Sequence, residues 1–254
     1  MLNFNRPLGL DPITDYIDNL CPMEADDCHY IIHMDAGAQS TLTEYMSDIF
    51  YRNRIRHFGG RERFLEYRLD GSLSQLHQVL EDIDANACYT NHFEGIIALD
   101  IAGLARFVNQ TQTEVFLKAL PELGKHSTML FFAPTLPNRN LDRLSARIQE
   151  VLSDVMVFRP APYNAEHLAG IILHALDENG IVLDCSEELY DCIMDLVRST
   201  GTGTVREAHQ LARKLGRCAD RTGLRPTLSA EDLLIITEET TLTKMKKEAM
   251  YNEV

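Results

Sequence analysis

Residues 35–41 have the position of a phosphate-binding loop, between an apolar run and an amphipathic segment. Residues 30–34 before it are largely apolar and predict a buried strand. Apolar residues then recur at helical spacing through 42–50, so a helix is expected to begin directly after the loop. In this strand–loop–helix context, backbone N–H groups, a lysine and a Ser or Thr can bind nucleotide phosphates and Mg²⁺.

Only part of the phosphate-binding pattern is present. Gly37 and Thr41 match it, with Thr41 at the position of the magnesium-binding hydroxyl. Met34 and Gln39 stand where the first and last glycines are expected, and Ser40 stands where the lysine is expected. Without that lysine, the β and γ phosphates lose their main fixed positive charge, and the Gln39 side chain obstructs a close backbone approach.

Further apolar segments alternate with helical patterns along the first two thirds of the chain. They predict four more strands, at residues 63–69, 95–100, 127–134 and 155–158. Continuously apolar strands that alternate with helices are typical of a parallel sheet covered on both faces. Asp100 ends one of these strands; its carboxylate could bind a metal or cap a helix, and its neighbours favour the cap.

After Pro162 the pattern changes to helices alone. Asn164 is expected to cap the first of them, and Asp184 with Glu187 resembles a capping box for the second. The sequence therefore predicts an α/β fold, with a P-loop-type parallel sheet of about five strands and a C-terminal helical lid. The expected parts are an N-terminal lead-in at 1–29, the α/β domain at 30–162, the lid at 163–225, and a short helix with a polar tail at 226–254.

The composition bears on the partners. The net charge is −14, which argues against nucleic acid as a partner because phosphate backbones bind basic surfaces. The densest basic run, residues 52–63, is more typical of a solvated helix end. The six cysteines are scattered, and Cys28-His29 lacks a second ligand pair, so no metal site is expected there. With no apolar run of roughly 18 residues and no signal-peptide pattern at the N-terminus, we expect a cytoplasmic protein without a membrane span.

The order of elements resembles the AAA+ ATPases, and within them the CbxX, rubisco-activase-like type, over roughly residues 30–225. The most specific part is Gly-Thr-Gly-Thr-Val-Arg-Glu-Ala-His-Gln-Leu at 201–211, which is similar to the Gly-Asn-Ala-Arg signature of the third lid helix. The resemblance places Arg206 where that type has its sensor-2 arginine, which contacts the γ-phosphate. Alternatively, Arg206 is a solvated or ion-paired residue at the start of a helix, and this structural role is favoured over nucleotide binding.

The resemblance also implies that several functional groups are missing. The Walker A loop would be 34–41, without its lysine and two glycines. The Walker B strand would end at Asp100, which could hold Mg²⁺, but Ile101 replaces the glutamate that polarises the attacking water. Loss of a general base costs about 10²–10⁴ in rate. The sensor-1 residue would be Pro134 or Thr135.

Two further features of the type are absent. No arginine lies at 152–154, where the arginine finger is expected, although Arg147 and Arg159 flank that place. Such a finger is worth about 10³–10⁵ in phosphoryl transfer. The central-pore loop would follow Asp70, at residues 71–74, and this segment contains no aromatic residue.

These losses together favour a catalytically inactive AAA+-like subunit that acts by binding proteins. Its expected partner is an active AAA+ subunit, in a homo- or hetero-oligomeric ring or with this chain as an adaptor. No catalytic residue and no cofactor are expected, although ATP or ADP with Mg²⁺ remains open. The residual nucleotide site would comprise Gly37, Ser40, Thr41, Asp100 and Arg206. Two alternatives also remain open: a divergent ATPase that remodels proteins, and a nucleotide-sensing module without hydrolysis.

Overall fold

A computed structural model describes residues 6–20, 28–53, 63–87, 92–184, 186–222 and 227–233. Most of the basic run, three of the cysteines and most of the predicted tail lie outside these residues. The chain divides into two compact units, residues 1–162 and 163–254. None of the described helices is both long and apolar enough to cross a membrane.

The first unit contains a five-stranded sheet with the order β2-β3-β4-β1-β5, and every pairing is parallel. This confirms the predicted α/β fold with a parallel sheet of five strands. The three central strands are buried along their whole length, as their largely apolar sequences predict. The strand bounds are β1 His29–His33, β2 Phe64–Arg68, β3 Ile96–Asp100, β4 Thr128–Ala133 and β5 Val155–Phe158.

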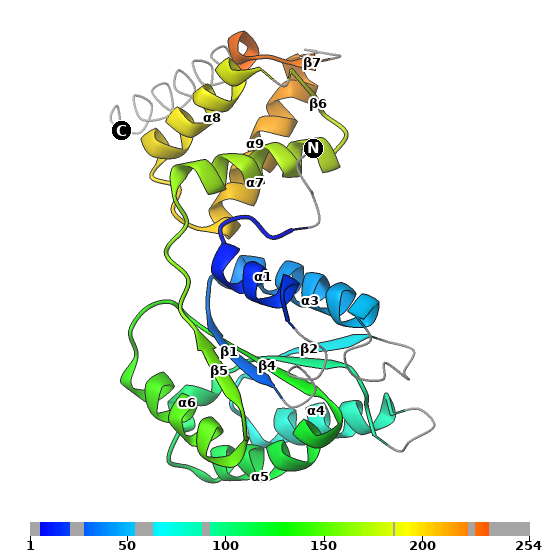
Figure 1. Cartoon of the computed structure of the whole chain (residues 1–254). Helices are drawn as coiled ribbons and strands as arrows, with labels where there is room; N and C mark the ends of the chain where they lie inside the picture. Colours follow the sequence, from blue (N-terminus) through cyan, green and yellow to red (C-terminus); the bar gives the residue numbers. More distant parts are fainter. Residues whose placement is uncertain are drawn as a thin grey trace, which may run out of the picture. The chain divides into compact units, whose positions relative to one another are not determined.

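Helices cover both faces of this sheet (Figure 1). One face carries α1 (Asp11–Asp18) and α3 (Gln39–Asn53); the other carries α4 (Leu73–Ala85), α5 (Thr111–His126) and α6 (Arg139–Val151). The connection from β1 runs to the far edge of the sheet at β2, and the later connections run back. Right-handed crossovers in opposite directions place their helices on opposite faces, which explains why α3 is separated from α4, α5 and α6.

The second unit is built from α7 (Ala165–Glu178), α8 (Glu187–Thr200) and α9 (Val205–Thr222). Asn164 caps α7 through the backbone N–H of His167, as expected. The expected cap at Asp184 is wrong, because Ser186 caps α8 by accepting from the backbone N–H of Leu189.

This unit also contains a small parallel sheet that the sequence did not predict. It pairs β6 (Val182–Leu183) with β7 (Thr227–Leu228). After β7, Ser229 and Asp232 exchange hydrogen bonds as a capping box for the helical residues 230–233.

Candidate functional site

The carboxyl ends of β1, β4 and β3 lie at one edge of the sheet, where parallel α/β folds bind their ligands. Backbone hydrogen bonds continue past the strands there: Met34 N donates to Ala133 O at 2.9 Å, and Ile101 N donates to Phe132 O at 3.0 Å. The loops after β1 and β3 therefore begin from fixed positions. Four of the five residues in the residual nucleotide site lie in or directly beside these loops.

In the loop between β1 and α3, the Asp35 side chain accepts a hydrogen bond from the backbone of the same loop. Residues Ala36–Ala38 form a short 3₁₀ helix, and Asp35 caps it. The Asp35 carboxylate accepts a hydrogen bond from the backbone N–H of Gly37 at 2.8 Å, and Ala38 N donates to Asp35 O at 3.1 Å. A phosphate-binding loop turns such N–H groups toward an anion. Here they already have intramolecular acceptors, and one acceptor is itself negatively charged.

Met34 and Gln39 frame this loop. The Met34 side chain is only 2% exposed and belongs to the core. Gln39 begins α3, and its carbonyl accepts from the Thr43 hydroxyl at 3.0 Å. Met34 is therefore a packing residue at the position where a phosphate-binding loop has its first glycine.

Ser40 and Thr41 occupy the first turn of α3. The Ser40 hydroxyl donates to a carboxylate oxygen of Glu66, on β2, at 2.9 Å. Thr41 is exposed. Around the position of the expected lysine, the structure thus places a serine and an acceptor carboxylate rather than a cation.

Asp100 is held at the end of β3. One of its carboxylate oxygens accepts from the backbone N–H of Ala102 at 3.0 Å, and the other lies 3.7 Å from the Arg68 guanidinium. The carboxylate therefore caps the turn after β3, and its side chain is 9% exposed. The next residue, Ile101, is fully buried in the main core, so its side chain does not face the carboxyl edge as a solvated base would.

The loop after β4 makes a partly buried polar contact with His33. His33 Nδ1 lies 3.2 Å from the carbonyl oxygen of Pro134, one of the two sensor-1 candidates. Burial lowers the pKa of His33, so its ring is neutral at physiological pH. The neutral ring can then donate from Nδ1 to that carbonyl, and His33 contacts the strand end without adding positive charge.

The arginines of this unit that flank residues 152–154 have local partners. Arg147 donates to the backbone carbonyl of Val108 at 2.8 Å and pairs with Glu114 at 2.7 Å. Arg159 pairs with Asp142 at 3.3 Å. Arg147 therefore links α6 to Val108, which lies just before α5, and to Glu114, which lies within α5.

The segment after β2 is a tight turn. Gly71 has a φ of +88°, and a Cβ at this position would lie 2.4 Å from the Phe107 ring. The Asp70 carboxylate accepts from the backbone N–H of Ser72 at 2.7 Å, and this bond lowers the pKa of Asp70. Ser72 then caps α4 through the backbone N–H of Gln75. The turn is packed against the body of this unit.

The first unit thus brings Gly37, Ser40, Thr41 and Asp100 to one edge of its sheet. Arg206 belongs to the second unit, in the first turn of α9, and is exposed. Sequence analysis did not single out Asp35 and Glu66. An aspartate two residues before a loop glycine is a recognisable turn signal, whereas no sequence pattern links Ser40 to Glu66.

Comparisons with known proteins identify the fold. No family model and no curated protein sequence matches the chain. Among solved structures, a P216G mutant of Thermotoga maritima RuvB matches with a TM-score of 0.62 and 12% identity, over 92% of this chain and 71% of RuvB. Domain III of the Thermotoga maritima replication initiation protein DnaA matches with a TM-score of 0.56 and 12% identity, over 94% of this chain and 97% of that domain. Both neighbours are AAA+ proteins, so the chain has an AAA+-like fold.

Proposed function

We propose that this chain is a catalytically inactive AAA+-like subunit, of the CbxX type, that acts by binding other proteins. It would serve as a ring subunit or an adaptor beside an active AAA+ partner. The observation that carries the proposal is the hydrogen bond from Gly37 N to the Asp35 carboxylate, which occupies the loop where phosphate would bind.

Electrostatics support the loss of nucleotide binding. A triphosphate in this loop would be repelled by the Asp35 carboxylate. The position of the expected lysine is occupied by Ser40, which is hydrogen-bonded to the Glu66 carboxylate. Two like unit charges 4 Å apart repel by about 1 kcal/mol in water and about 4 kcal/mol at an effective dielectric constant of 20. That range corresponds to a loss of about fivefold to nearly a thousandfold in affinity.

The surroundings of Asp100 support the loss of hydrolysis. Its carboxylate already accepts from Ala102 N, and the following side chain is the buried Ile101. A general base must reach the proton that it removes, directly or through one water. An isoleucine in the core cannot supply this function, whatever ligand the loop binds.

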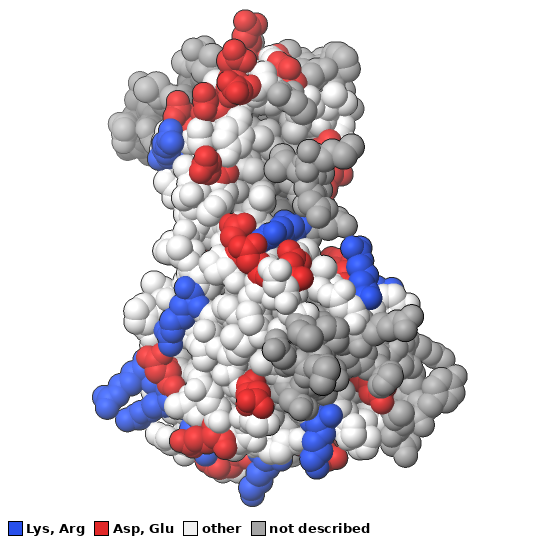
Figure 2. Space-filling model, in the orientation of Figure 1, with Lys and Arg blue, Asp and Glu red and all other residues white. Residues whose placement is uncertain are grey.

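The surface of the second unit supports a protein partner. Acidic side chains predominate on the visible face of this unit (Figure 2). On α8, Glu187, Glu188, Asp191 and Asp195 are exposed, whereas Arg198 is the only basic residue of the helix. Such a face favours encounter with a basic protein surface. Head-to-tail contact between neighbouring subunits would produce a ring if the rotation closes.

Calorimetric titration with ATP and ADP, with and without Mg²⁺, tests the inactive site. We expect no heat of binding and no thermal stabilisation at millimolar nucleotide. As a positive control, the Asp35→Ala/Gln39→Gly/Ser40→Lys variant should bind ATP more tightly than the natural chain. Micromolar ATP binding by the natural chain would refute the proposed loss of the phosphate site.

Light scattering tests the proposed assembly. We expect oligomers of this chain alone, or a mixed complex with an active AAA+ subunit, and we expect salt to slow formation of a mixed complex that uses the acidic face of α8. A strict monomer, alone and with every candidate AAA+ partner, would argue strongly against a ring subunit or adaptor.

A second candidate is a module that binds nucleotide without hydrolysis, and the position of Asp100 at the carboxyl edge favours it. In that case ATP with Mg²⁺ should bind, and Asp100→Asn or Arg206→Ala should weaken binding without any turnover to lose. Turnover that disappears in Asp100→Asn would instead identify a divergent ATPase.

A further inference from the structure

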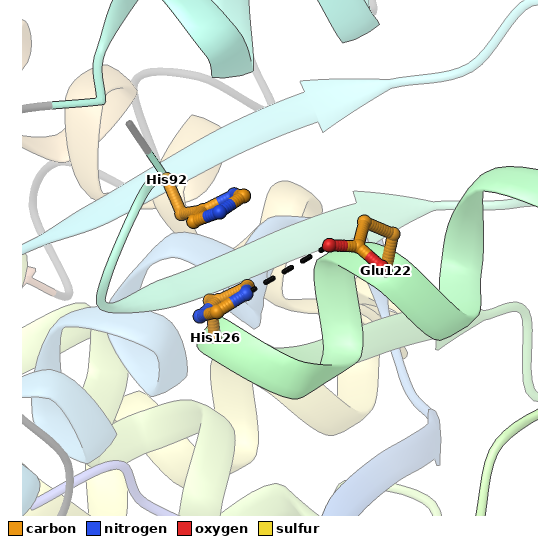
Figure 3. A group of neighbouring side chains, drawn as sticks. All are labelled: His92, Glu122 and His126. Atoms are coloured by element: carbon orange, nitrogen blue, oxygen red, sulfur yellow. Dashed lines mark ion pairs between the residues drawn. The ribbon is translucent and has the colours of Figure 1, made fainter. Parts of the chain in front are cut away.

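Three side chains with metal-binding atoms converge at the amino edge of the sheet, the edge opposite the Asp35 loop. His92 precedes β3, whereas Glu122 and His126 lie one turn apart at the end of α5, just before β4. One ligand atom from each residue lies within 4.8 Å of the other two. Figure 3 shows the His126 ring facing both the His92 ring and the Glu122 carboxylate. Within the described parts of the chain, no other group of three such residues comes this close.

Backbone and side-chain hydrogen bonds hold the two histidines beside each other. The Ser127 hydroxyl donates to the Phe93 carbonyl at 2.5 Å, and Thr128 N donates to Gly95 O at 2.9 Å. The Phe93 side chain is buried in the main core. His92 and His126 therefore each adjoin a residue that is fixed to the other segment, so little chain entropy is lost in bringing their rings together.

The three ligand atoms are close enough to share an ion once the histidine rings turn out of their stacked arrangement. The His92 and His126 rings are parallel, with centroids 3.9 Å apart, and His126 Nε2 lies 3.9 Å from a carboxylate oxygen of Glu122. Ligand atoms bound to zinc at about 2.1 Å in a tetrahedron lie about 3.4 Å apart. Imidazole nitrogens bind a metal in the plane of the ring, so at least one of the stacked rings must rotate to direct both toward the ion. The partly exposed Glu122 and His126 side chains can make this rotation and close the remaining distance, because neither residue is in the core.

The chemistry of the three ligands points to a particular class of ion. Two imidazoles and one carboxylate suit zinc and neighbouring transition metals rather than Mg²⁺ or Ca²⁺, which prefer oxygen ligands. The carboxyl end of α5 also carries the negative end of the helix dipole, which stabilises a cation. We propose that His92, Glu122 and His126 bind one divalent transition-metal ion of the zinc class, with water completing its coordination.

Lys125 competes with this ion for Glu122. Its ammonium lies 2.7 Å from one carboxylate oxygen, while the other oxygen faces His126. A metal ion at the other oxygen would be repelled by the ammonium. Removing the Lys125 charge should therefore tighten metal binding.

A bound ion would join the segment before β3 to the end of α5. Because only the folded chain brings these ligands together, binding must stabilise the fold by RT ln(1 + [L]/Kd). The site thus gives a readout that is independent of nucleotide and of any protein partner.

Titration of the untagged full chain with Zn²⁺, by calorimetry and thermal unfolding, tests the site. We expect one ion per chain and a higher Tm. His126→Ala and Glu122→Gln should each weaken binding by at least about tenfold, whereas Lys125→Met should strengthen it. The matched control is His174→Ala, which removes another histidine–glutamate pair at the same helical spacing, His174–Glu178 at 3.3 Å, and should leave the affinity unchanged.

The absorption spectrum with Co²⁺ separates this site from the cysteines, since thiolate ligation gives intense near-ultraviolet bands and nitrogen–oxygen ligation does not. Weak visible bands that disappear in His126→Ala would support the proposal. Absence of Zn²⁺ binding, thiolate bands at one equivalent, unchanged affinity in His126→Ala with native circular dichroism, or an equal loss in His174→Ala would each overturn it.

Discussion

The Asp35 carboxylate accepts a hydrogen bond from the backbone N–H of Gly37, 2.8 Å away, within the loop that joins the first strand to its helix. This short-range contact uses the donor that a phosphate-binding loop would turn toward its ligand. Asp35 therefore has a structural role that is incompatible with binding an anion at the same amide.

Removing this cap should lower stability without creating an ATP site. Asp35→Ala leaves Gly37 N without its side-chain acceptor, and loss of a capping side chain typically costs about 1 kcal/mol. We expect a loss of that size in the free energy of unfolding, measured by urea denaturation. ATP binding should remain undetectable because the lysine is still absent. Thr41→Ala, at an exposed position of α3, is the control and should change stability little. ATP binding by the Asp35→Ala variant would contradict this expectation and would mean that a lysine from another segment binds the phosphates.

Restoring the glutamate that follows Asp100 should damage the fold. Ile101 is 0% exposed, so Ile101→Glu would bury a carboxylate among apolar side chains. We expect a loss of more than about 3 kcal/mol, or no soluble protein, and no ATPase activity. Ile101→Leu conserves volume and should cost less than about 1.5 kcal/mol. A stable Ile101→Glu protein would show that this side chain can turn toward the carboxyl edge.

Alanine substitutions at Gly71 and Gly180 should distinguish the cost of backbone strain from the cost of steric overlap. Gly71 has a φ of +88°, and an added Cβ would lie 2.4 Å from the Phe107 ring; Gly180 has a φ of +75° with nothing within 4 Å. Gly180→Ala should cost about 1–2 kcal/mol from the backbone conformation alone. Gly71→Ala should cost clearly more because the overlap is added. Denaturant unfolding followed by circular dichroism, with a transition fitted for each unit, measures both. Equal costs would contradict a packed turn at Gly71.

His33 should make stability depend on pH below neutrality. Burial lowers its pKa in the folded state below the usual value of 6.5. The unfolded chain therefore takes up a proton first as the pH falls. The stabilising contribution of the neutral ring is complete above about pH 6.5 and is lost as the pH falls from there toward the folded-state pKa.

Comparison of two variants isolates this histidine. Between pH 7 and 5, the natural chain should lose stability more steeply than His33→Gln, by at most about 1.4 kcal/mol per pH unit. His77→Gln, which changes an exposed residue of α4, should retain the natural slope. Parallel profiles for the natural chain and His33→Gln would mean that His33 is protonated equally in both states.

Local sequence patterns alone predict the parallel sheet and most of the helices. Buried strands such as Ile96–Asp100 were predictable because an uninterrupted apolar run suits a strand covered on both faces. Helices such as α4 were predictable from the apolar spacing of Leu76, Val79 and Ile83. These patterns involve residues that are close in the chain, so they can be recognised in a single sequence.

The contacts between side chains from distant segments could not be predicted from the sequence. Ser40 contacts Glu66 and His92 stacks on His126 because parallel strands align loops that are distant in the chain. Strands β6 and β7 of the small sheet are only two residues long, which is too short to give a periodic pattern of apolar residues in the sequence. The pair Glu122 and His126 has a helical spacing that is visible in the sequence, but the third residue of that group is contributed by a different segment. Such contacts depend on strand order and register, which no local pattern specifies.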